Sequence, residues 1–241
     1  MTVSTNQRGL MALADDIRAL RDRVLADLNA AHDYYTDTRI AWDLVRQIIA
    51  AGHTFSIRNM TTSNVTTQRE LSQKARGYVA EQLTEATFQQ FITIFENYFF
   101  DVLRLWLMAY PKSLSGKKVD FDTVLDAPDK TAITLHVVNK ELNEILYARP
   151  RDWFAYLEDK AKLGCPPPDE IDKIAEAKAS RDVLVHSRGV ASKTYELKAG
   201  KLARYKEGHR IDIPEHYHRE TWELIRKMTS DISNAAIAKV Q

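Results

Sequence analysis

The sequence predicts an all-α protein, and three observations carry this prediction. Only 8 glycines and 7 prolines occur in 241 residues, which disfavours a chain of short strands and tight turns. Apolar residues recur every three or four positions over long stretches, which is the spacing of one helix face. Apolar residues make up 44% of the chain and charged residues 28%, the ordinary balance of a folded domain with a core and a charged surface.

The N-terminal part is expected to be helical up to Gly52, a residue type that commonly follows a helix end. A second apolar stretch, from Ile40 to Ile49, follows the first, so the two form either one long helix or a bent pair. The polar residues 53–67 predict a loop. We expect residues 1–65 to be an N-terminal helical extension of a domain at 66–241. The first apolar face is formed by Leu10, Leu13, Ile17, Leu20, Val24 and Leu28.

The rest of the chain also has helical spacing. Residues 68–110 predict a second long helical region, with a break near Gly77 and an aromatic face at the centre of the core. Residues 119–130 are expected to be a connection, and residues 190–213 predict a small β-hairpin. Four further helices are predicted, at about 131–147, 151–163, 169–188 and 214–240.

Composition excludes several classes of protein. The net charge is +1, from 34 basic and 33 acidic residues, so the whole chain does not favour a polyanionic partner. A single cysteine, Cys165, excludes an internal disulfide and a cysteine-based zinc site. The first residues lack the apolar run of a secretory signal, and the most apolar stretch, 91–110, carries three charged side chains. We therefore expect a cytoplasmic protein without a membrane segment.

The most informative motif lies in the C-terminal quarter, which carries an excess of basic residues. Arg181 and His186 enclose four residues, and Asp182 follows the arginine directly. This pattern resembles the R-x4-6-H motif of the HEPN superfamily. The resemblance implies a HEPN-like helical bundle and a metal-independent endoribonuclease of the toxin, abortive-infection or stress-defence kind. It also implies that the active site forms at a homodimer interface.

The resemblance implies a role for each residue of the motif. His186 would act as the general base or acid, because imidazole titrates near neutral pH. Arg181 would bind the scissile phosphate through its planar guanidinium group. Asp182 would orient one of these two side chains, and Arg188 and Ser187 would contact RNA.

Glu96 and Asn97 are polar residues that lie outside the motif, in the mostly apolar stretch 91–110. Buried polar groups need partners, and in this family such a position can face the active site. Both residues are therefore candidates for supporting roles.

The spacing of the motif places a geometric condition on catalysis. Five residues along a regular helix turn the chain by about 500°, so the Arg181 and His186 side chains point about 140° apart. They share a site only from its two edges, or if the helix ends near His186. One copy also supplies one imidazole, whereas cleavage by the 2′-hydroxyl needs both a base and an acid. A two-fold dimer would supply two.

No cofactor or metal is expected from the sequence. Motifs for phosphate loops, dinucleotide binding and zinc proteases are absent. His216 and His218 have no cysteine or carboxylate to complete a metal site. The expected partners are RNA, a second copy of the chain, and an antitoxin or other protein partner.

Two alternatives to the nuclease remain open. The first is a non-catalytic HEPN-like module that binds RNA, a nucleotide or a protein partner. The second is a structural protein that assembles through its N-terminal helices. A nuclease needs Arg181 and His186 accessible in one basic groove, whereas a structural role would hold both in pairs within the chain. In that case Arg181 would pair with Glu176 or Asp182, and His186 would cap the helix end.

Overall fold

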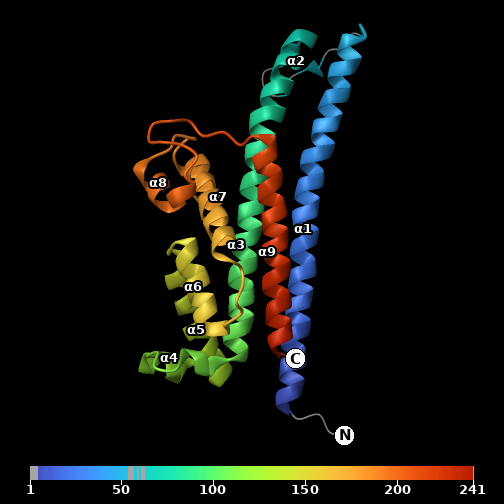
Figure 1. Ribbon diagram of the computed structural model, residues 1–241. Helices are drawn as coiled ribbons and strands as arrows, with labels where there is room; N and C mark the ends of the chain where they lie inside the picture. Colours follow the sequence, from blue (N-terminus) through green and yellow to red (C-terminus); the bar gives the residue numbers. More distant parts are fainter. Residues whose placement is uncertain (1–4, 54–56, 59, 61–62, 241) are drawn as a thin grey trace.

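The computed structural model describes residues 5–53, 57–58, 60 and 63–240, without the side chains of residues 5–10 (Figure 1). The described chain is mostly helical, which confirms the predicted class at that level. In chain order the elements are α1 (Thr5–Ala50), β1 (Ile57–Arg58), β2 (Val65–Thr66), α2 (Gln68–Gly77), the π-helix η1 (Tyr78–Leu83), α3 (Thr84–Ala109), the 3₁₀ helix η2 (Pro111–Leu114), α4 (Phe121–Asp126), α5 (Lys130–Leu146), α6 (Pro150–Ala161), α7 (Pro168–His186), α8 (Lys193–Ala199), the 3₁₀ helix η3 (Gly200–Leu202) and α9 (Glu215–Val240).

Three long helices, α1, α3 and α9, lie side by side, and α1 runs in the direction opposite to the other two (Figure 1). Polar contacts join them. The Tyr98 hydroxyl on α3 donates a hydrogen bond of 2.9 Å to the Thr229 carbonyl on α9. The Trp222 indole on α9 donates one of 3.1 Å to the Leu28 carbonyl on α1. The shorter helices α4 to α8 lie on the other side of α3 (Figure 1).

Helix α3 provides the centre of the core, as the aromatic face of residues 68–110 predicted. Its side chains pack between α1 and α9 on one side and α6 and α7 on the other. Burial of large apolar side chains is the main favourable contribution to folding, so this face stabilises the bundle more than any local helix preference. The buried aromatic side chains of α3 are Phe88, Phe91, Phe95, Tyr98, Phe99 and Trp106.

The N-terminal segment is one long helix, which decides between the two sequence-based alternatives. The first half of α1, from Leu13 to Ala31, lies in the same core as α3 and α9. The predicted face there is buried, except that the Leu10 side chain lies outside the described part. The second half extends beyond α9 and lies beside α2 (Figure 1). The division at residue 65 stays a prediction, but the two parts share one core.

The predicted β-hairpin at 190–213 is wrong. This stretch contains α8 and η3, and its strand-like feature is an isolated bridge between Val190 and Arg210. Helix formation prevails because the Ser192 side chain caps α8 by accepting a hydrogen bond from the Tyr195 amide, at 3.3 Å. Tyr195 and Ala199 are both buried while Leu197, midway between them, is 67% exposed, which is helical and not strand spacing.

Two segments expected to be irregular contain short elements instead. In residues 53–67 the described residues form an antiparallel pair, with Ile57 opposite Thr66 and Arg58 opposite Val65. Residues 54–56, 59 and 61–62 of the predicted loop lie outside the described part. The connection at 119–130 contains α4. The predicted break near Gly77 is a change to π-helical turns at Tyr78–Leu83, after which α3 continues.

Candidate functional site

The motif lies in the second half of α7. Pro168 occupies the first turn, where its missing amide costs no hydrogen bond, and acidic Asp169 and Glu170 follow it there. The helix ends at His186, and Gly189 adopts a positive φ of 78° as the chain turns away. The imidazole of His186 is therefore exposed at a helix end, which was one of the conditions for sharing a site with Arg181.

Arg181 and His186 both line one pocket of about 480 Å³, here called the candidate pocket. Its walls come from three places in the chain: the residues from Leu146 to Pro150 where α5 joins α6, helix α7 from Ala175 onward, and α8 with Ser192 before it. The two side chains, about 140° apart around the helix, thus line the same pocket.

Arg181 is held in place by two carboxylates. One terminal nitrogen pairs with Glu96 on α3, and the other lies 3.2 Å from an oxygen of Asp182. The Arg181 side chain is only 16% exposed, and its buried Nε has no hydrogen-bond partner within the described chain. A planar guanidinium paired with carboxylates in this way is held in a defined orientation.

Two lysines complete the charge network. Lys178 lies 2.9 Å from Glu96 and 3.3 Å from Asp182, and Lys198 on α8 lies 3.2 Å from Asp182. Three cations thus share two carboxylates. Arg149 also lines the candidate pocket, so its wall carries more positive than negative charge. Such an excess favours an anionic ligand.

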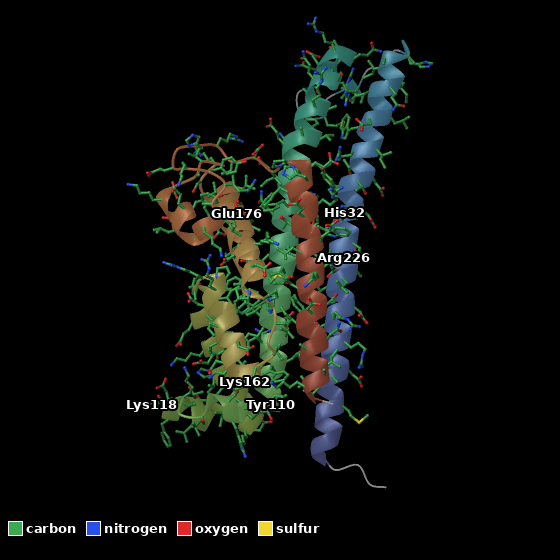
Figure 2. All side chains as sticks on the ribbon, viewed as in Figure 1. His32, Tyr110, Lys118, Lys162, Glu176 and Arg226 are labelled. Carbon is green, nitrogen blue, oxygen red and sulfur yellow. The ribbon has the colours of Figure 1, made fainter. Side chains whose placement is uncertain are left out.

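The phenol of Tyr195 forms part of the wall between α7 and α8. Its hydroxyl donates a hydrogen bond of 2.8 Å to Glu176, a buried carboxylate near the middle of α7 (Figure 2). Burial, with the Glu176 charge as a further cause, raises the pKa of Tyr195 to about 12. Tyr195 therefore stays protonated near neutral pH and positions α8 instead of accepting a proton.

The structure brings most of the predicted site residues together. Arg181, Asp182, His186 and Ser187 all line the candidate pocket, and Glu96 on α3 pairs with Arg181. The pairing of Arg181 with Asp182 is also one of the contacts that the structural alternative named.

Two predicted residues are not part of this group. Asn97 is exposed, because it follows Glu96 on α3 and therefore points about 100° away from it. Arg188 is exposed and does not line the candidate pocket. It adopts a positive φ of 50° in the turn after α7, and its carbonyl accepts a hydrogen bond from Arg210. The predicted supporting role of Asn97 and the predicted RNA contact of Arg188 therefore do not involve the candidate pocket.

Sequence reasoning missed Lys178, Lys198, Arg149 and Tyr147, which also line the pocket. Lys178 carries a local signal, because it precedes Asp182 by four residues and so lies on the same helix face. The other three come from separate elements, and no spacing in the sequence relates them to the motif.

Within the described residues, no group of three or more histidine, cysteine or acidic side chains is arranged to hold a metal ion. No helix in the same part of the chain is long and apolar enough to cross a membrane. In comparisons with known proteins, no family model, curated protein or solved structure matched the chain. The fold and the site therefore define a mostly helical protein with a basic pocket at the end of α7.

Proposed function

We propose that the chain is a metal-independent endoribonuclease of the HEPN type, whose active site is completed by a second copy. The observation that carries the proposal is that Arg181 and His186 line one pocket with Lys178, Lys198 and Arg149. The pocket combines an accessible imidazole with an excess of cations. Those are the groups needed to move protons and to stabilise a charged phosphorus centre.

The proposed reaction is cleavage by the neighbouring 2′-hydroxyl of the RNA. A base removes the proton of this hydroxyl, and the oxygen attacks the phosphorus while the bond to the 5′ oxygen breaks. An acid then protonates the leaving 5′ oxygen, which gives a 2′,3′-cyclic phosphate and a 5′-hydroxyl. His186 of one copy would be the base and His186 of the other the acid, with Arg181 beside the phosphate.

One observation favours a second candidate function, a non-catalytic module that binds RNA or a nucleotide. Arg181 already has carboxylate partners in Glu96 and Asp182. These contacts are those expected of a structural arginine, and they leave Lys198, Arg149 and His186 as the more accessible groups of the pocket. A binding module of this kind would tolerate the loss of His186.

An RNA cleavage assay in EDTA separates the two functions. We expect wild-type protein to cleave RNA, and His186→Ala and Arg181→Ala each to lose at least about a hundredfold of the rate. His209→Ala is the matched control, because His209 is also exposed but does not line the candidate pocket. Circular dichroism must show that each variant is folded. RNA binding without cleavage by the wild type would support the binding module, and cleavage that survives His186→Ala would exclude the proposed mechanism.

Dimerisation gives an independent test of the same proposal. If two copies complete the site, the rate per molecule must fall when the protein is diluted below the dissociation constant of the dimer. Analytical ultracentrifugation over the same concentrations measures the dimer directly. A rate per molecule that stays constant across the dissociation of the dimer would show that one copy suffices.

A further inference from the structure

A groove of about 500 Å³ lies between α7 and α9, and its lining residues differ from those of the candidate pocket. The two helices run in opposite directions (Figure 1). Glu170, in the first turn of α7, pairs with Lys227 on α9. Glu176, further along α7, accepts a hydrogen bond from Tyr217 near the start of α9. This α7–α9 groove is lined, among others, by Glu170, Glu176, Leu202, Glu220, Leu224 and Lys227.

The middle of the α7–α9 groove is apolar. Leu224 on α9 and Leu202 in η3 line it, and both side chains are partly buried. Leu224 lies on the same helix face as Glu220 and Lys227, because it follows the first by four residues and precedes the second by three. From Glu220 to Lys227 the helix rises by about 10 Å. The groove is thus elongated, with an apolar floor between two charged ends.

The Glu170 end has more negative than positive charge. The Lys227 ammonium group lies 2.7 Å from Glu170 and 2.7 Å from Asp231, so one cation faces two carboxylates. Glu170 is 8% exposed, and its buried Oε2 has no hydrogen-bond partner in the described chain. A buried carboxylate oxygen without a donor is unfavourable. A ligand donor that reaches Oε2 would relieve this cost, and the exposed Lys227 side chain can move aside to admit it.

The opposite end also carries a carboxylate without a partner. Glu220 is exposed and forms no ion pair with any other described residue. Glu223, one turn further along α9, lies 4.0 Å from Arg219 and is therefore compensated. Each end of the groove thus has one negative charge in excess.

The cations of the α7–α9 groove are already paired. Arg204 lies 3.1 Å from Glu176, a buried carboxylate. Lys173 lies 3.7 Å from Asp169, which does not line the groove. An anionic ligand would have to displace these carboxylates, whereas a cationic ligand would meet carboxylates that lack a partner. The distribution of charge therefore favours a cationic ligand.

We propose that the α7–α9 groove binds a linear aliphatic diamine, with one ammonium group at Glu170, the other at Glu220, and the methylene chain on Leu224 and Leu202. Two separated carboxylates require two separated cations, and the apolar floor between them fits a hydrocarbon chain and not a hydrated metal ion. This site lies outside the proposed nuclease site, so the inference goes beyond the proposed function and its test needs no RNA.

Isothermal titration calorimetry tests the proposal with three probes. These are 1,8-diaminooctane, whose extended chain has about the length of the groove, n-octylamine, which has one ammonium group, and magnesium chloride. The variants are Glu170→Gln and Glu220→Gln. Glu141→Gln is the matched control for a buried carboxylate, and Glu81→Gln the one for an exposed carboxylate, because neither residue lines the α7–α9 groove. Circular dichroism must show that each variant is folded.

We expect 1,8-diaminooctane to bind at one site per chain. Glu170→Gln should weaken this binding at least about tenfold, because a buried charged hydrogen bond is lost. Glu220→Gln should weaken it about threefold, since an exposed ion pair contributes less. Both control variants should bind as the wild type does. The wild type should bind n-octylamine about threefold more weakly than the diamine, and magnesium should not displace the diamine.

Three results would overturn the inference. The first is the absence of saturable diamine binding by folded wild-type protein. The second is equal binding by the groove variants and their controls, and Glu220→Gln decides this even if Glu170→Gln does not fold, because Glu220 is exposed. The third is binding of n-octylamine or magnesium as tightly as the diamine. RNA cleavage is measured separately, so a failure of the proposed function leaves this result unchanged.

Discussion

Glu96 shows how one side chain organises the candidate site. Its two oxygens take Lys178 and Arg181, so a single residue of α3 determines where two cations of α7 lie. All three side chains are mostly buried, and removal of one member of such a group leaves the remaining charges without compensation. Glu96 therefore matters for the stability of the fold as well as for the geometry of the pocket.

We expect Glu96→Gln to lower the free energy of unfolding by about 2 kcal/mol, which is the usual contribution of hydrogen bonds to charged groups. Urea unfolding measures this as a shift of the midpoint with an unchanged slope. The matched control is Asn97→Ala, at the neighbouring exposed position, which should change stability by less than about 0.5 kcal/mol. Equal stability of Glu96→Gln and Asn97→Ala would show that the pairing contributes nothing.

His218 is a second residue whose surroundings have a measurable consequence. Its ring is fully buried between α1, α3 and α9, and Nε2 lies 2.8 Å from the Thr87 hydroxyl while Nδ1 has no partner in the described chain. Burial, together with the nearby His32 and Arg39, lowers the pKa of His218 from 6.5 to about 4, and Glu215 opposes this shift. The pKa of His32 is lowered by burial in the same direction.

This shift predicts a pH dependence of stability. Between pH 6.5 and about 4 the unfolded chain binds a proton at His218 and the folded chain does not, so acidification stabilises the unfolded state. The free energy of unfolding should be highest above pH 6.5 and fall by about 3 kcal/mol as the pH approaches 4. His218→Phe should remove most of this slope, with a remainder from His32. Urea unfolding at a series of pH values measures both, and an unchanged slope in the variant would contradict the assignment.

At the scale of the element, the end of α8 depends on glycine. Gly200 has φ of 64° and ψ of −136°, a backbone conformation that other residues rarely adopt. A side chain at this position would also meet Arg151, whose guanidinium lies within 3.3 Å of the expected Cβ position. Arg151 belongs to α6 and pairs with Asp172 at 2.8 Å. The end of α8 therefore lies against a side chain that also holds the N-terminal part of α7.

We expect Gly200→Ala to destabilise the protein by about 1–3 kcal/mol, through backbone strain and displacement of Arg151. Gly77→Ala is the matched control, because Gly77 lies within α2 with open space at its Cβ, and alanine there should be neutral or stabilising. Thermal unfolding by circular dichroism compares the two. A Gly200→Ala variant as stable as Gly77→Ala would show that the chain relaxes at this position.

At the scale of the whole molecule, α1 is an integral part of the bundle. Ile17, Val24 and Leu28 are buried against α3 and α9, and the Trp222 indole bonds to α1 across the interface. Loss of this helix would expose one side of α3 and α9, both of which carry large apolar side chains. The candidate site on the other side of α3 depends on this core, because Glu96 is positioned by α3.

We therefore expect a chain that begins at residue 66 to lose cooperative unfolding and to aggregate, since the apolar surface that α1 covers would face water. Thermal unfolding by circular dichroism measures the cooperativity and size-exclusion chromatography measures the aggregation, each in comparison with the full chain. The control is a full chain with Ile40→Ser and Leu44→Ser, at exposed positions of the second half of α1, which should remain folded. A stable, monodisperse fragment would show that residues 66–241 fold alone.

The sequence by itself determined the helical class and the position of most helices, because periodic apolar residues and caps are local properties of the chain. It also located Arg181, Asp182 and His186, whose spacing and helix end are local too. Only the tertiary structure decided that Glu96 pairs with Arg181, and that Lys198, Arg149 and Tyr147 line the candidate pocket. These contacts join residues far apart in the chain, and the packing of α3, α5, α7 and α8 brings them together. Tertiary packing also contributes to α8, because burial of Tyr195 against α7 favours a helix where the sequence predicted a β-hairpin.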